Sequence, residues 1–267
     1  MLELDLWPGK NELEGQPIIT HGNTLCSIVS AESVLKTIAD YCEKEKQFYP
    51  IILTLENHLS DELQDKFAGA LKKILKPWLY FKPARPDKLP TLEQLACKIL
   101  IRGKASNPKL NKLIFFRTQH ASEKAIIGDE KFVNQHRLQT SVSVNESSSF
   151  FKKKEKVEQV RKFNSQIVNK VFPAGKKIDS SNYNPVQKWE MGFQVVALNY
   201  QSSDQKTLVN NDFFNYHGNI GYVLKPKYVA EQIKIKLQLK YRAYFKIVIL
   251  IFNWLHMKLL GCFVISQ

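Results

Sequence analysis

Three carboxylates near the start of the chain could bind a divalent cation. In segment 2–6, the alternation of a strand would put Glu3 and Asp5 on one face and the leucines on the other. Two neighbouring carboxylates repel each other unless a cation or a proton neutralises them, and Ca²⁺ and Mg²⁺ prefer such oxygen ligands. Glu56 follows the apolar run 50–55 and is a third candidate ligand. The alternative is an edge strand with a solvated acidic face.

One histidine is a candidate acid or base. His21 follows the short apolar run 17–20 and precedes Gly22, so we expect it where a strand passes into a loop. Imidazole exchanges a proton near neutral pH, which suits general acid–base chemistry. A lone histidine can equally be a structural hydrogen-bonding residue. Its position after a strand end favours the same rim as the carboxylates.

The elements that must position these residues alternate between strand-like and helical patterns, as in a mostly parallel sheet. Apolar residues at three- and four-residue spacing predict surface helices over 31–45, 61–75 and 152–168. The expected strands are 2–6, 50–55, 98–102, 112–117, 170–172, 194–200 and 221–224. This pattern favours a (β/α) barrel, whose active sites lie at the C-terminal ends of the strands. No phosphate-binding glycine motif follows a strand, which disfavours a nucleotide-binding fold.

Composition and charge narrow the class of protein. The 267 residues are 44% hydrophobic with eleven Gly, eleven Pro and four Cys, which excludes collagen, low-complexity disorder and a disulfide-stapled mini-protein. Residues 1–104 carry 14 basic and 14 acidic side chains, whereas residues 105–267 carry 25 and 11. The surplus of positive charge in the second part indicates a polyanionic partner: nucleic acid, an anionic membrane face or a phosphorylated ligand. No recognisable nucleic-acid module is present, so we expect no nucleic-acid partner.

Two segments have open interpretations. Segment 140–162 is polar, Ser-rich and then basic, and is either a loop entering a solvated helix or a loop that contacts an anion. Segment 247–265 is apolar but interrupted by Asn253, His256 and Lys258. It could span a membrane, cover an open barrel edge, or be unrelated to the rest of the chain.

Several long motifs resemble one family. LELDLWPG, PIITHGNTL, YPIILTLENH and CKILIRGK look like the X half of the catalytic domain of eukaryotic phosphoinositide-specific phospholipase C. VFPAGKKIDSSNYNPVQKWEMGFQVVALNYQ and GNIGYVLKP resemble its Y half. On this basis we expect the X half over 1–104, a short connection and a following strand region over 105–148, the Y half over 149–230, and a tail over 231–267, a C2 remnant or a hydrophobic helix.

The resemblance implies a fold and an activity. The fold is α/β, a TIM-like (β/α) barrel lacking its first strand, with a short C-terminal tail outside the family. The activity is hydrolysis of phosphatidylinositol 4,5-bisphosphate to diacylglycerol and inositol 1,4,5-trisphosphate with one Ca²⁺, in intracellular lipid signalling. The implied partners are the phosphoinositide substrate and an anionic membrane surface, and the implied location is cytoplasmic and peripheral at the membrane. The upstream activator is not indicated.

The resemblance also assigns roles residue by residue. Glu3, Asp5 and Glu56 match calcium ligands, and Glu3 is also a candidate base for the inositol 2-hydroxyl. His21 matches a catalytic histidine. The implied headgroup contacts are Arg102, Lys104, Ser149, Lys170 and Phe172, the family usually having Arg and Tyr at the last two.

The resemblance begins one strand after the start of the family's barrel. That first strand bears a His-Asn pair, a catalytic histidine and a calcium ligand, which the sequence does not include. The alternative function is therefore a catalytically impaired relative that binds phosphoinositides.

Overall fold

The computed structural model describes residues 1–21, 27–81, 89–128, 130–135, 139–175 and 179–230. Two compact units are present, Met1–Gln119 with Leu138–Ser141, and His120–Arg137 with Val142–Gln267. The expectations for segment 247–265 and for the tail from 231 onward lie outside the described residues. Among the described residues, no helix is both long enough and apolar enough to cross a bilayer.

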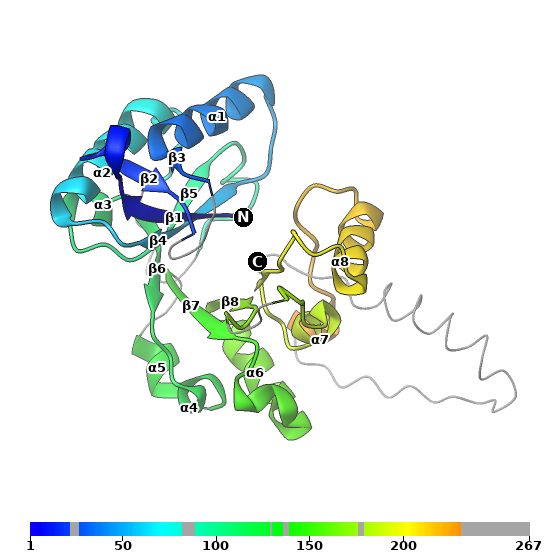
Figure 1. Ribbon diagram of the computed structural model, residues 1–267. Helices are drawn as coiled ribbons and strands as arrows, with labels where there is room; N and C mark the ends of the chain where they lie inside the picture. The colour runs from blue at the N-terminus through cyan, green and yellow to red at the C-terminus, as the bar shows by residue number, and fades with distance from the viewer. Residues whose placement is uncertain (22–26, 82–88, 129, 136–138, 176–178, 231–267) are drawn as a thin grey trace, which may run out of the picture. The chain divides into compact units, whose positions relative to one another are not determined.

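The first unit is built on a mostly parallel sheet (Figure 1). Its strands lie in the order β3-β2-β1-β4-β5-β6. They are β1 (Leu2–Pro8), β2 (Pro17–Ile19), β3 (Val29–Ser30), β4 (Ile51–Asn57), β5 (Ile99–Gly103) and β6 (Ile114–Gln119). The strands β1, β4, β5 and β6 are parallel, while β1, β2 and β3 pair in antiparallel fashion.

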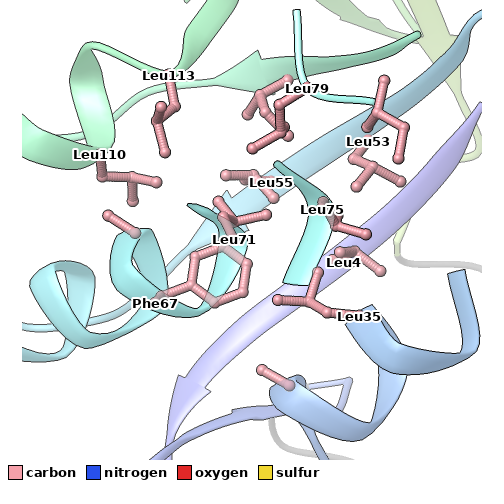
Figure 2. Packing of buried hydrophobic residues seen from close by; sticks show 14 of the residues in the cluster. Leu4, Leu35, Leu53, Leu55, Phe67, Leu71, Leu75, Leu79, Leu110 and Leu113 are labelled. Atoms are coloured by element: carbon pink, nitrogen blue, oxygen red, sulfur yellow. The ribbon is translucent and has the colours of Figure 1, made fainter. Parts of the chain in front are cut away.

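Two amphipathic helices pack on one face of this sheet. They are α1 (Ala31–Lys44) and α2 (Asp61–Leu75), and Ser30 and Ser60 cap their first turns by accepting backbone N–H bonds. Figure 2 shows Leu4, Leu53 and Leu55 of the strands against helix residues that include Leu35, Phe67, Leu71 and Leu75. Because strand side chains alternate, the even-numbered residues of β1 face this core and the odd-numbered ones lie on the opposite face. The short helix α3 (Pro108–Asn111) follows β5.

The second unit has its own apolar core. Its elements are α4 (Glu123–Ile126), α5 (Glu130–Gln135), β7 (Thr140–Asn145, whose first two residues belong to the first unit), η2 (Ser149–Lys152), η3 (Lys154–Lys156), α6 (Val157–Asn164), β8 (Val168–Phe172), α7 (Pro185–Glu190), β9 (Val195–Val196), α8 (Gln205–Tyr216) and α9 (Lys227–Ala230). Buried side chains of β7, α6, β8 and α7 pack together, including Val142, Val160, Val171 and Trp189. Strand β8 pairs in parallel with β9.

The expected α/β class with a mostly parallel sheet is confirmed, and so are the helices at 31–45 and 61–75. Four expectations need correction. Residues 140–145 form the buried strand β7 rather than a polar loop, and the helix expected over 152–168 contracts to α6, because Val168 already begins β8. The strand expected over 194–200 is only Val195–Val196. No strand forms over 221–224, which begins at Gly221 with a positive φ angle, and Gly218 and Asn219 just before it also have positive φ angles.

Candidate functional site

The three carboxylates named from the sequence lie together. Glu3, Asp5 and Glu56 each offer a ligand oxygen, and these oxygens all lie within 4.8 Å of one another. Glu3 and Glu56 are exposed and Asp5 is half-buried, so a cation could reach them from solvent. An all-oxygen anionic donor set at this spacing fits a hard divalent cation such as Ca²⁺.

The register of two parallel strands creates this cluster. Asp5 of β1 lies directly beside Glu56 of β4. Glu3 lies beside Thr54 of β4, which in turn lies beside Arg102 of β5. On the face opposite the helices, Glu3, Thr54 and Arg102 therefore form one row across the sheet, and Asp5 and Glu56 form the next row, toward the C-terminal end of β4.

A fourth side chain, that of His58, contacts the carboxylate cluster. His58 was not among the site residues predicted from the sequence. The Nε2 atom of His58 lies 3.2 Å from Oε1 of Glu56, and the His58 ring stacks on Trp7 with 4.0 Å between centroids and an interplanar angle of 20°. The signal in the sequence was the Glu-x-His spacing at a strand end, which places both side chains on one face if the strand continues.

His21 lies at the strand exit expected for it. It is exposed and follows Thr20, whose N–H donates to the carbonyl oxygen of Asp5 over 3.2 Å. The residue before His21 is therefore hydrogen-bonded to β1, the strand that carries Glu3 and Asp5. The glycine after it lies outside the described residues.

Arg102 and Lys104 occupy different environments. Arg102 is 2% exposed, and its Nε donates to Oγ of Ser141 over 2.6 Å. Burial lowers the pKa of Arg102 to about 10, while the nearby Glu3 carboxylate opposes that shift, so the guanidinium stays protonated at neutral pH. Lys104 follows the end of β5 and is exposed, and its carbonyl oxygen accepts a bond from Nδ2 of Asn57.

Ser149 begins η2 in the second unit and is held by an acidic side chain. Its N–H donates to Oε1 of Glu123 over 2.7 Å, and its hydroxyl donates to Oε2 over 2.5 Å. These bonds, chiefly that from the hydroxyl, hold the pKa of Glu123 below its usual value. In this arrangement Ser149 joins η2 to the first turn of α4.

Lys170 and Phe172 lie two residues apart on β8, so both side chains point to one face. Lys170 is buried, and its Nζ lies 5.7 Å from the centre of the Phe172 ring. The role of Lys170, Phe172 and Ser149 in headgroup binding stays a prediction.

A second buried lysine, Lys188, was not predicted from the sequence. Lys188 of α7 is 4% exposed, and its Nζ lies 3.2 Å from the centre of the Phe151 ring and 5.6 Å from that of Tyr183. Burial lowers the pKa of Lys188 to about 8, although the Glu146 carboxylate opposes the shift. Nothing in the local pattern of residues 185–190 distinguishes this lysine from an exposed one, because its burial arises from tertiary packing.

The sheet and the carboxylate cluster define an α/β protein with a candidate cation site where the C-terminal end of β4 lies beside β1. Residues 1–105 match the family model described as phosphatidylinositol-specific phospholipase C, X domain, and residues 110–228 match the Y domain of the same family. The chain belongs to the phosphatidylinositol-specific phospholipase C family.

Individual relatives agree with the family match. The chain is 32% identical to "1-phosphatidylinositol 4,5-bisphosphate phosphodiesterase delta-3-A" of Danio rerio, over 86% of this chain and 34% of the relative. It is 29% identical to "Inactive phospholipase C-like protein 2" of Mus musculus, over 87% of this chain and 24% of the relative. The crystal structure of PLC21 of S. officinalis superposes with a TM-score of 0.76 at 29% identity, over 88% of this chain and 33% of that one. The chain thus spans about a third of the length of the first of these relatives.

Proposed function

We propose that this protein hydrolyses phosphatidylinositol 4,5-bisphosphate to diacylglycerol and inositol 1,4,5-trisphosphate in a Ca²⁺-dependent reaction at an anionic membrane surface. The observation that carries the proposal is the cluster of Glu3, Asp5 and Glu56, whose ligand oxygens lie within 4.8 Å of one another. The names of the delta-type phosphodiesterases that match the chain support the substrate.

The carboxylates would hold Ca²⁺, which when bound lowers the pKa of a coordinated hydroxyl and offsets charge on a phosphoryl group. Glu3 is the candidate base that takes the proton of the inositol 2-hydroxyl. His21, exposed two residues after the end of β2, is the candidate donor to the phosphoryl oxygens as negative charge develops on them.

Basic side chains would bind the ring phosphates. The exposed ammonium group of Lys104 can form charge-assisted bonds with a phosphate that arrives from solvent. Lys170 keeps a positive charge where the family usually has Arg but loses the bidentate geometry of a guanidinium. Phe172 keeps an aromatic face for the inositol ring and lacks a hydroxyl.

A second candidate is a catalytically impaired protein that binds phosphoinositides without hydrolysing them. The observation that favours it is the match to a relative named an inactive phospholipase C-like protein, at an identity close to that of the phosphodiesterases. Binding of headgroups needs the basic residues but not the carboxylate cluster, whereas hydrolysis needs both. The two candidate functions can therefore be distinguished by replacing a carboxylate.

The test is the release of inositol trisphosphate from vesicles that contain phosphatidylinositol 4,5-bisphosphate, with the full chain, in Ca²⁺ and in a chelator. We expect release that depends on Ca²⁺ and is lost in Glu56→Gln. Vesicle binding without release in Ca²⁺ would instead establish the impaired relative. Release that persists in the chelator would contradict the metal-dependent mechanism.

A further inference from the structure

We propose that His58 is a positioning residue that orients the Glu56 carboxylate toward the cation, and that Trp7 fixes the His58 ring in the plane this requires. The inference rests on the proposed function, because it takes Glu56 as a cation ligand. It adds two residues that the sequence motifs did not select.

The backbone places these side chains at the edge of the cluster. The parallel ladder between β1 and β4 ends with Leu6 beside Asn57, and the N–H of His58 continues it by donating to the Leu6 carbonyl oxygen over 2.9 Å. By alternation, His58 lies on the same face as Glu56, and Trp7 on the same face as Asp5. The two rings therefore meet two residues beyond the Asp5–Glu56 pair, on the same face.

The imidazole makes a directed contact with one carboxylate oxygen. Nε2 of His58 lies 3.2 Å from Oε1 of Glu56. Since an ionised carboxylate only accepts hydrogen bonds, we assign the donor as the Nε2–H of His58. A carboxylate has about four lone-pair sites, so this bond leaves Glu56 able to bind a cation as well. Such outer partners fix the orientation of a ligating side chain and thereby raise metal affinity.

Stacking determines which way the imidazole faces. The centroids of the Trp7 and His58 rings are 4.0 Å apart and their planes differ by 20°. Rotation of the imidazole out of this plane would lose the stacking contact and move Nε2 away from Glu56. Trp7 comes from β1, which also carries Glu3 and Asp5, so the stack joins the two ligand-bearing strands at the cluster.

A purely structural role does not explain the contact. The side chains of His58 and Glu56 are 36% and 55% exposed. Exposed ion pairs contribute little to stability, because solvent screens the charges and two flexible side chains must be ordered. Removing the imidazole should therefore leave the fold intact, which allows its effect on cation affinity to be measured directly.

Two variants of His58 separate the hydrogen bond from the stacking. His58→Phe keeps a ring against Trp7 but has no donor, while His58→Gln keeps a donor at a similar reach but has no ring. Calorimetric titration of the full chain with CaCl₂ should show a Kd about tenfold higher for His58→Phe, the usual size for loss of an outer-shell partner. His58→Gln should recover only part of that loss, because stacking on Trp7 does not fix its donor. The thermal midpoint of both should match the unmodified chain.

Control variants distinguish an effect of His58 from an effect of Trp7 and from a failure of the proposed metal function. His120→Phe, at an exposed histidine after β6, should leave the Kd for Ca²⁺ unchanged. Wild-type affinity in His58→Phe, or no recovery in His58→Gln, would overturn the role of His58. Wild-type affinity in Trp7→Leu would overturn the role of Trp7. Failure of the unmodified chain to bind Ca²⁺ would instead reject the proposed metal function, and this inference with it.

Discussion

Arg102 donates a hydrogen bond from Nε to the hydroxyl of Ser141 over 2.6 Å, and thereby connects β5 to the second residue of β7. Arg102 is 2% exposed, yet burial lowers its pKa only to about 10, so the guanidinium carries a charge at neutral pH. The Glu3 carboxylate, two strands away in the same row of the sheet, favours that charge. Arg102 therefore contributes to the architecture of the sheet as well as to its positive potential.

Replacing Arg102 should lower stability. In Arg102→Ala, the buried hydroxyl of Ser141 loses this partner and Glu3 loses a compensating charge. We expect a loss of about 1–3 kcal/mol in the free energy of unfolding from the hydrogen bond alone. Urea denaturation provides the measurement, with Arg117→Ala on the exposed part of β6 as the control. Equal midpoints for the Arg102 variant and the unmodified chain would show that the contact contributes nothing to stability.

Replacing Lys104 should affect binding instead. The side chain is exposed, so Lys104→Ala should leave the unfolding midpoint unchanged. It should reduce binding to vesicles with phosphatidylinositol 4,5-bisphosphate several-fold more than binding to phosphatidylserine vesicles of equal charge. Vesicle co-sedimentation measures both, with Lys112→Ala as a control. An equal loss on the two kinds of vesicle would mean that Lys104 acts only through non-specific electrostatics.

The sequence predicted elements whose stability comes from local pattern. The helix at Asp61–Leu75 was predicted with its bounds, because its apolar periodicity and the Ser60 cap both lie within the segment. The strand β7 was missed because most of its residues are polar, whereas its burial comes from packing against segments that are distant in the sequence. Ser141, for example, bonds to Arg102, 39 positions away. No local pattern contains such information.

At the candidate site, too, the residues predicted from the sequence are those that a local pattern indicates. Glu3, Asp5 and Glu56 could be grouped from the sequence, because alternation puts Glu3 and Asp5 on one face of their strand and Glu56 follows a second strand-like run. His58 was not selected: the Glu-x-His spacing puts it on the face of Glu56, but its contact with Trp7 depends on the register of two strands. Register follows from the packing of both strands rather than from either segment alone.

Replacing Glu56 should weaken Ca²⁺ binding. Glu56→Gln keeps the size of the side chain and removes one negative charge from the three that meet within 4.8 Å. We expect a Kd for Ca²⁺ at least tenfold higher, since affinity at such sites follows the number of charged ligands. Calorimetry provides the measurement, and Glu62→Gln, exposed on α2, is the matched control. If the two variants bind Ca²⁺ equally well, Glu56 is not a ligand.

Lys188 should make stability depend on pH. Its pKa is about 8 in the folded chain, because burial disfavours the charged amine, and 10.5 when unperturbed. Between these values the unfolded chain binds the extra proton, so deprotonation of Lys188 makes the free energy of unfolding rise with pH. From pH 7.5 to 9.5 the unmodified chain should gain of order 1 kcal/mol relative to Lys188→Met, which cannot titrate. Urea denaturation at each pH measures this difference, and Lys154→Met, at an exposed lysine, should show none. A difference between Lys188→Met and the unmodified chain that stays constant over this range would mean that Lys188 keeps its proton in the folded chain, stabilised by Glu146 and the Phe151 ring.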